Sequence, residues 1–215
     1  EMEDRVIAMA AALAARGAAK GDRILVHSKN CNEMFESMFA AFRLGAVWVP
    51  TNFRLLPDEV AALAQDSGAA IFLCHADFPD HAAAVRKAAP EIDVVSLGGE
   101  AGFGDADIHS LIEAHRGAQA PVAAVEHDDP CWFFFTSGTT GRSKAAVLTH
   151  GQMAFVVNNH LCDLVPATTE EDASLVVAPL SHGAGIHQLN VVARGAPTIL
   201  LPTGRFDVDE AFRLI

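Results

Sequence analysis

Short apolar runs of strand character alternate with longer segments of helical spacing along the first hundred residues, and this alternation limits the possible folds most strongly. The strand-like runs lie at 23–27, 46–49, 70–73 and 93–97. The helical segments lie at 3–16, 32–44, 57–68 and 79–89. Glycines close several of these helical segments, and Pro57 opens one of them. Such alternation is typical of an α/β fold, in which helices flank a largely parallel sheet.

A second set of elements follows residue 130. The run Cys131–Phe135 is rich in aromatic residues and predicts a central strand. Further strands are expected at 145–148, 175–178 and 198–201, and Thr149 is expected to cap a helix that continues to about Leu164. The stretch before this set is rich in Ala, Pro and charged residues and has no periodicity. We therefore expect a first α/β lobe at 1–118, a linker at 119–130 and a second α/β lobe at 131–215.

Charge and hydropathy exclude several classes of partner. The chain has 215 residues, of which 51% are hydrophobic, and 15 basic against 27 acidic residues give a net charge of −12. An acidic surface repels phosphate backbones, so no nucleic-acid partner is expected. The apolar run Val6–Ala15 is far shorter than the roughly 20 residues that cross a bilayer. The acidic start lacks the basic residues of an export signal, which predicts a cytoplasmic protein.

The cysteines and histidines predict no metal site. The four cysteines, Cys31, Cys74, Cys131 and Cys162, are widely spaced in apolar sequence and are expected to be reduced core residues. His182 and His187 lack a third ligand of suitable spacing for zinc, and we expect His187 to pack or to lie at the surface. The cluster 127–129 is interpreted as solvated charge in the linker.

The segment directly after the aromatic run predicts an anion-binding loop. It reads Thr136-Ser137-Gly138-Thr139-Thr140-Gly141-Arg142-Ser143-Lys144. Two glycines three positions apart let the backbone turn and bring its amides close to a ligand, and hydroxyls and cations gather beside them. The spacing differs from the GxxxxGK[ST] of a P-loop nucleotide triphosphatase, and the segment joins two strands. A polar hairpin turn is the alternative, but nine consecutive residues of this kind favour a phosphate ligand.

The stretch FTSGTTGRSKAAVLTH closely resembles the signature of the adenylate-forming superfamily, which includes acyl-CoA synthetases, luciferases and the adenylation domains of peptide synthetases. The usual pattern is TSGTTGxPKG, followed by a hydrophobic run and (T/S)H. Thr136–Gly141, Lys144 and Thr149-His150 match it, whereas Ser143 replaces proline and Ala145 replaces glycine. These departures make the loop less rigid and its exit more crowded, which bears on efficiency more than on identity.

The resemblance covers essentially the whole chain. Leu25–Asn30 and Phe42–Asn52 are similar to the early GA(V)xVPxN region, and Ala178–Gly185 is similar to the PLxHxxG segment. It implies the N-terminal portion of the large domain of such an enzyme, with stacked, largely parallel sheets flanked by helices. The magnesium ligand, the ribose-binding aspartate and the C-terminal domain with its lysine are then expected beyond Ile215, so the isolated chain is expected not to complete the reaction.

The resemblance also implies an activity. Members of the family use ATP and Mg²⁺ to convert a carboxylic acid, here fatty or aromatic, into an acyl-adenylate with loss of pyrophosphate, and many pass the acyl group to coenzyme A. It implies that residues 136–144 bind the phosphates, with Thr139, Lys144 and His182 as catalytic residues.

Two alternatives to this activity remain open. One is an adenylating enzyme that loads the thiol of a carrier protein, and the other is a non-catalytic nucleotide-binding module. For His182 the alternative is a structural histidine that is hydrogen-bonded to neighbouring backbone.

Overall fold

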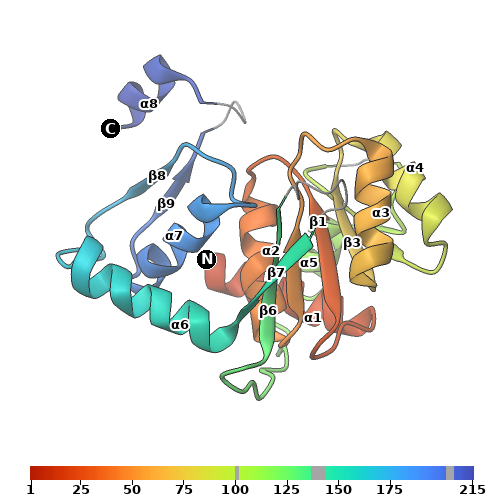
Figure 1. The fold of residues 1–215 in the computed structure, drawn as a ribbon, viewed down its shortest axis with the longest axis horizontal. Coiled ribbons are helices and arrows are strands. Elements are labelled where there is room, and N and C mark those ends of the chain that lie inside the picture. The colour runs from red at the N-terminus through yellow and green to blue at the C-terminus, as the bar shows by residue number, and fades with distance from the viewer. Residues whose placement is uncertain (100–101, 137–143, 202–205) are drawn as a thin grey trace.

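A computed structural model describes residues 1–99, 102–136, 144–201 and 206–215, and it confirms the α/β architecture (Figure 1). A seven-stranded sheet has the order β5-β4-β3-β1-β2-β6-β7, in which every pair is parallel except β6 with β7. Its strands are β1 (Arg23–His27), β2 (Val47–Pro50), β3 (Ile71–His75), β4 (Asp93–Leu97), β5 (Ala106–Asp107), β6 (Pro130–Thr136) and β7 (Lys144–Thr149).

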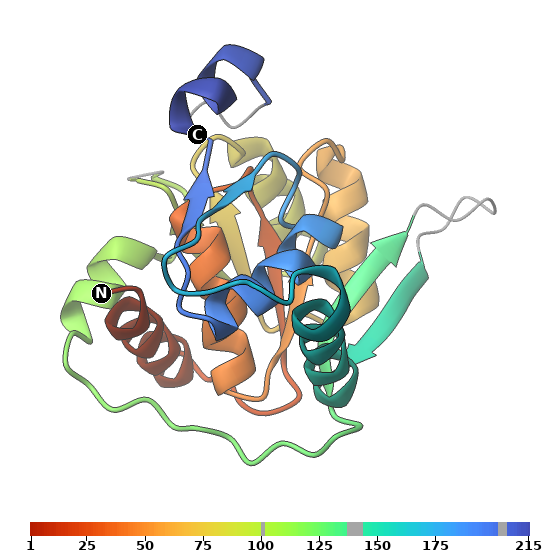
Figure 2. The same cartoon turned by 90° about the vertical axis from the view of Figure 1, so that its left-hand side faces the viewer.

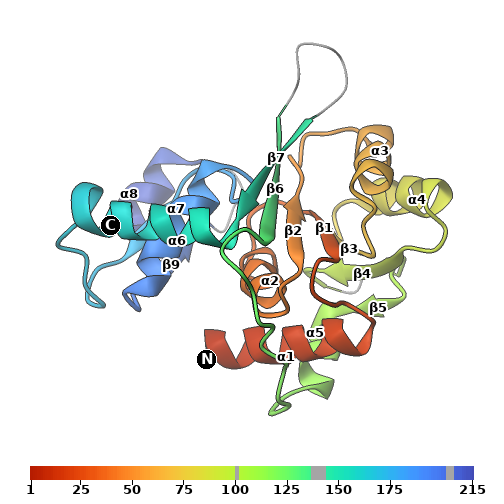
Figure 3. The same cartoon turned by 60° about the horizontal axis from the view of Figure 1, so that its bottom comes forward.

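Helices cover both faces of this sheet (Figure 3). Helices α1 (Met2–Ala15), α2 (Asn32–Arg43) and α5 (Ile108–Ala114) pack on one face, and α3 (Pro57–Ser67) and α4 (Pro79–Ala88) pack on the other. Neighbouring strand residues such as Ile24 and Leu25 are fully buried in different cores, because successive side chains of a strand point to opposite faces. The short elements β5 and α5 have no counterpart in the sequence prediction.

The predicted helix boundaries agree with the structure to within one or two residues. Helix α3 begins at Pro57, as expected from a residue that needs no amide partner there, and it ends at Ser67, where Gly68 caps it with φ of +61°. Thr149 caps α6 (His150–Asn159) through a capping box: its hydroxyl accepts from the Gln152 amide at 3.2 Å, and its own amide donates to the Gln152 side chain at 3.0 Å. A π-helix, η1 (His160–Leu164), continues α6 to the predicted end.

The aromatic run predicted as a central strand forms β6, which lies between β2 and β7 and so is next to the edge of the sheet. Trp132 of β6 pairs in register with Trp48 of β2, and the two fully buried rings meet edge to face with centroids 4.6 Å apart. Beyond Trp132 the strand is only half-buried. The aromatic residues therefore build the end of the sheet where parallel pairing changes to antiparallel.

A second, two-stranded parallel sheet lies beside the large one (Figures 1 and 2). It consists of β8 (Ser174–Val176) and β9 (Thr198–Leu200), with α7 (Gly183–Ala193) between them and α8 (Val208–Leu214) after them. The sheet hydrogen bonds do not follow the expected boundary at 119–130, because β6 and β7 lie beyond that stretch and still continue the first sheet. The division of the chain into two lobes stays a prediction.

The cysteines behave differently from one another. Cys74 and Cys131 are buried as predicted, and burial raises the pKa of each thiol to about 12. Cys31 is half-buried at the N-cap of α2, where its sulfur accepts from the Met34 amide. The prediction of a core position was wrong for Cys162, which is exposed on η1. Of the helices in the described ranges, none combines the length and the apolar character needed to span a bilayer.

Candidate functional site at the carboxyl edge of the sheet

The carboxyl ends of β1, β2 and β6 meet at one edge of the sheet, because these neighbouring strands are parallel. β1 leads there to Asn30, β2 leads to Thr51 and Arg54, and β6 ends at Thr136. Ligands of open α/β sheets bind outside the carboxyl ends of the strands. The segment predicted to bind phosphate therefore begins at the edge where a ligand is expected.

Thr136 and Lys144 are the two described ends of that segment. They are register partners in the β6–β7 hairpin, and the Thr136 hydroxyl donates to the Lys144 carbonyl at 3.4 Å. Both residues are exposed, so the Lys144 ammonium is accessible to an anion. The predicted roles of Ser137, Gly138, Thr139, Thr140, Gly141, Arg142 and Ser143 fall outside the described residues and stay predictions.

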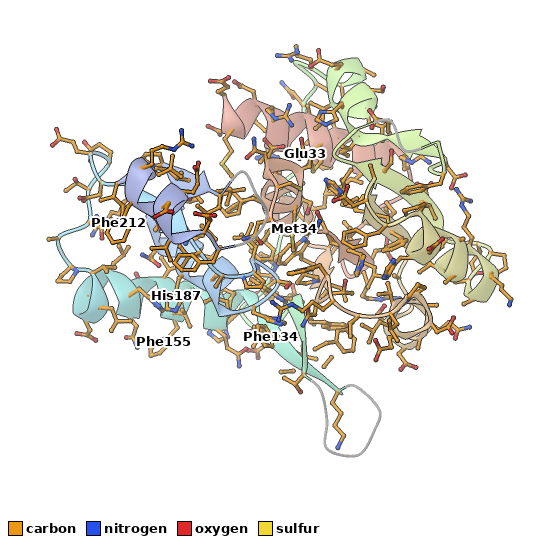
Figure 4. The ribbon with its side chains drawn as sticks, turned by 90° about the horizontal axis from the view of Figure 1, so that it is seen from above. Glu33, Met34, Phe134, Phe155, His187 and Phe212 are labelled. Atoms are coloured by element: carbon orange, nitrogen blue, oxygen red, sulfur yellow. The ribbon has the colours of Figure 1, made fainter. Side chains whose placement is uncertain are left out.

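His182 lies at the N-cap of α7, beside the strand that leads to the predicted loop. Its ring centroid is 5.5 Å from that of Phe134, and Phe134 shares a face of β6 with Thr136 two residues further on. In Figure 4, Phe134 lies where β6 and β7 leave the body of the molecule. Sequence reasoning did not identify Phe134 as a neighbour of the site, because an aromatic residue in a buried strand is explained by packing alone.

One ring nitrogen of His182 makes a hydrogen bond within the protein. Nδ1 lies 2.9 Å from the Ser181 carbonyl oxygen, which only accepts, so Nδ1 carries the proton and donates it. In the neutral ring the lone pair is therefore on Nε2. This backbone hydrogen bond is the one expected if His182 is a structural histidine. The bond also fixes the orientation of the half-buried ring. Among the described contacts, Nε2 of the ring has no hydrogen-bond partner.

Gly185 explains why α7 approaches β6 so closely. A Cβ atom at this position would lie 2.2 Å from the Leu180 carbonyl oxygen and 2.9 Å from Cη2 of Trp132. The Gly185 amide also donates to the His182 carbonyl at 3.0 Å. Only glycine fits this first turn, and the turn holds the segment that carries His182 against the buried end of β6.

Asn30 connects β1 to the same segment. Its Nδ2 donates to the Ala178 carbonyl at 2.9 Å, and its Oδ1 accepts from the Leu180 amide at 2.8 Å. Asn30, Arg54, Pro179 and Phe206 are among the residues that line a cavity of about 160 Å³ beside this contact. No local sequence pattern indicates the contact, because its partners lie 148 and 150 positions away.

A buried histidine supports this edge from within. Thr51 donates its hydroxyl proton to the Val26 carbonyl at 3.1 Å, so the Nδ1 of His27, 2.6 Å from the Thr51 oxygen, must be the donor. The His27 ring stacks on His81 with centroids 4.3 Å apart. Burial, together with the nearby His81, lowers the pKa of His27 to about 3, so His27 is neutral at physiological pH.

The remaining candidates lie apart from this edge. His187 is exposed and hydrogen-bonds His160 at 2.8 Å, next to α6 in Figure 4. His160 donates Nδ1 to the Val156 carbonyl, so its Nε2 accepts the proton of His187 Nδ1. Asp128 and His127 form an exposed pair at 2.7 Å. Across the described parts of the chain, no three His, Cys, Asp or Glu side chains gather as a metal site would require.

In the sequence, the connection between β6 and β7 of this α/β sheet is rich in glycine and threonine, and comparison with known proteins identifies the family of the chain. The chain belongs to the AMP-binding enzyme family, whose model matches residues 1–215. The chain is 35% identical over 202 residues to a feruloyl-CoA synthase of an Amycolatopsis species, and 29% identical over 207 residues to an indoleacetate–CoA ligase of Aromatoleum aromaticum. These matches cover 93% and 96% of this chain but 38% and 40% of the relatives, so the chain spans about two fifths of their length.

Solved structures agree with this assignment. The ATP-bound MatB of Rhodopseudomonas palustris superimposes with a TM-score of 0.83 and 27% identity, over all of this chain and 41% of that one. MenE of Bacillus subtilis, in complex with the acyl-adenylate intermediate OSB-AMP, superimposes with a TM-score of 0.81 and 25% identity, over all of this chain and 52% of that one. The fold is that of adenylate-forming enzymes.

Proposed function

We propose that this protein activates a carboxylic acid with ATP, releasing pyrophosphate, and then transfers the acyl group to coenzyme A. The observation that carries the proposal is the meeting of two features at one sheet edge: the ends of the β6–β7 hairpin, where Lys144 is accessible, and His182 beside Phe134. Membership of the AMP-binding family and the CoA-ligase names of the relatives support it.

The chemistry requires alignment and charge neutralisation. A carboxylate oxygen of the acid attacks the α-phosphorus of ATP, a phosphorus–oxygen bond forms, and the bond to pyrophosphate breaks. The nucleophile belongs to the substrate, so the protein has to hold the reactants in line and balance the charge of the leaving group. In the second half-reaction the thiol sulfur attacks the acyl carbon, and AMP leaves.

Within this scheme the hairpin ends hold the triphosphate. Lys144 supplies positive charge to the departing pyrophosphate, while Thr136, Ser137, Thr139 and Thr140 supply hydroxyl and amide donors, and Arg142 adds a second cation. His182, with its Nδ1 proton directed to Ser181, presents Nε2 toward the acid and the α-phosphate. Mg²⁺ would neutralise phosphate charge, but no three His, Cys, Asp or Glu side chains among the described residues gather to hold it.

The acceptor and the acid are parts of the same proposal. The relatives include a feruloyl-CoA synthase and an indoleacetate–CoA ligase, which favours an aromatic acid, with fatty acids as the other class to test. We place the reaction in the cytoplasm, a reducing compartment that suits a chain with four free cysteines.

The test is acid-dependent exchange of labelled pyrophosphate into ATP by the intact protein, across a panel of aromatic and fatty acids. We expect exchange with at least one acid, and thioester formation when coenzyme A is added. Thioester on a carrier-protein thiol instead would favour the first alternative. Nucleotide binding without exchange for any acid would contradict the proposal and favour the non-catalytic module.

A further inference from the structure

The segment between β8 and α7 carries His182, and no strand in the described parts of the chain pairs with it. Val176 and Leu180 anchor its two ends in the core, where each is at most 2% exposed, while Val177 between them is half exposed. A turn closes the segment, since the His182 amide donates to the Pro179 carbonyl at 3.1 Å. Buried apolar side chains hold such a segment against the core, but they do not prevent it from sliding along its length, because hydrophobic contacts are not directional.

The Asn30 side chain fixes the position of the segment along its length through two directional hydrogen bonds. The donor of its amide meets the Ala178 carbonyl and the acceptor meets the Leu180 amide, at 2.9 and 2.8 Å, so both polar groups of one side chain are used on one segment. This two-point contact imitates the pairing of a neighbouring strand. The contact spans Ala178 to Leu180, so it ends two residues before His182, within the turn that starts at Pro179.

Asn30 is itself held firmly. It lies between β1, whose last residue His27 is buried, and Cys31, which caps α2 through its sulfur. On the β1 side, the Ser28 hydroxyl donates to the Lys29 carbonyl at 2.6 Å. The clamp therefore connects the segment that carries His182 to the rigid main sheet, while the helix cap does not depend on the Asn30 side chain.

We propose that Asn30 is a positioning residue for the adenylation step: its amide fixes residues 178–182, and thereby the place of His182 beside Phe134 and the β6–β7 hairpin. This inference rests on the proposed function for its catalytic consequence, but not for the clamp itself. Without the amide, the segment keeps its apolar anchors and loses its alignment. Misplacement of a catalytic group by about 1 Å can cost about 100-fold in rate, so we expect a loss of about 10- to 100-fold.

The first experiment measures hydrogen exchange of the intact protein in overlapping peptides that contain residues 178–184. In Asn30→Ala we expect the Leu180 amide to exchange at least about 10-fold faster than in the wild type, as its acceptor is gone. In Asn30→Asp the acceptor oxygen is retained, so Leu180 should stay protected. Asn32→Ala is the matched control, because Asn32 is exposed at the start of α2 two positions away. Unchanged protection in Asn30→Ala would overturn the clamp.

The second experiment measures acid-dependent pyrophosphate exchange with the same variants. A positioning role predicts that kcat falls in Asn30→Ala while KM for ATP and the thermal melting curve stay close to those of Asn32→Ala. A wild-type kcat in Asn30→Ala, with Leu180 protection lost, would overturn the positioning role. If the wild type itself shows no exchange with any acid, the proposed function fails, and the hydrogen-exchange result still decides on the clamp.

Discussion

Replacing Gly185 by alanine tests whether the first turn of α7 is in obligatory contact with β6. The new Cβ would lie 2.2 Å from the Leu180 carbonyl oxygen, and ordinary contact begins at 3.4 Å, so the gap must open by 3.4 − 2.2 = 1.2 Å. Neither obstacle yields easily, because one is backbone and the other is the buried Trp132 ring. Overpacking of this kind costs about 1–3 kcal/mol or more.

Gly183→Ala is the matched control for this substitution. Gly183 is exposed at the start of the same helix, and a Cβ there would meet no described atom within 4 Å. Both variants gain the better helix propensity of alanine, at most about 1 kcal/mol, so their difference isolates the steric cost. We expect Gly185→Ala to be less stable than Gly183→Ala by about 2 kcal/mol, or about 4–8 °C in melting temperature.

The assay is urea unfolding of the intact protein, followed by tryptophan fluorescence, with pyrophosphate exchange as a second readout. Because Trp132 contacts the site of the change, its emission should also differ in the native baseline. Equal midpoints for Gly185→Ala and Gly183→Ala, within about 0.5 kcal/mol, would refute the argument that this glycine is needed for close packing.

Two further predictions concern buried groups. The pKa of His27 is about 3 in the folded protein, below its ordinary value, so its stabilising contribution is complete above about pH 6.5 and is lost toward pH 3, by at most about 1.4 kcal/mol per pH unit. The stability difference between the wild type and His27→Gln should therefore shrink on acidification in urea titrations, and a pH-independent difference would contradict the buried neutral ring. Among the cysteines, Cys162 should react rapidly with a thiol reagent in the native protein while Cys74 and Cys131 stay unreactive; rapid labelling that peptide mapping locates at Cys74 or Cys131 would show that this burial pattern is wrong.

The sequence was most informative where a local rule decides the structure. Proline and glycine set the ends of α3, and Thr149 with Gln152 set the start of α6, because these residues act on the backbone beside them. Strands with continuous apolar runs were also predicted, as burial on both faces leaves a strong compositional signal.

Very short elements, and features that depend on distant parts of the chain, were not predicted. β5 consists of two residues that pair with β4, which is too few for a periodic pattern, although Asp107 does cap α5 through the Ser110 amide. Cys162 was misplaced because its apolar neighbours in sequence do not lie in the core: Leu164 on the same π-helix is 65% exposed.

In the candidate site too, local features were predicted from the sequence and long-range contacts were not. The sequence predicted strands at 131–135 and 145–148 with Thr136 and Lys144 in the loop between them, whereas the structure includes these two residues in β6 and β7. The contact of Phe134 with His182 and the clamp from Asn30 depend on how β8 and α7 dock against the main sheet. Such docking is set by three-dimensional packing, and single-sequence patterns carry no record of it.

The central claim is that the hydroxyl groups of the segment between β6 and β7 hold the triphosphate during acid activation. The most direct measurement is the rate of acid-dependent pyrophosphate exchange by the intact Thr139→Val/Thr140→Val double variant, compared with Thr168→Val/Thr169→Val, which makes the same two changes in the stretch between η1 and β8. We predict a fall of at least about 100-fold in the first variant, as expected when phosphate donors are removed, and wild-type exchange in the second. Equal exchange in both variants would contradict the account.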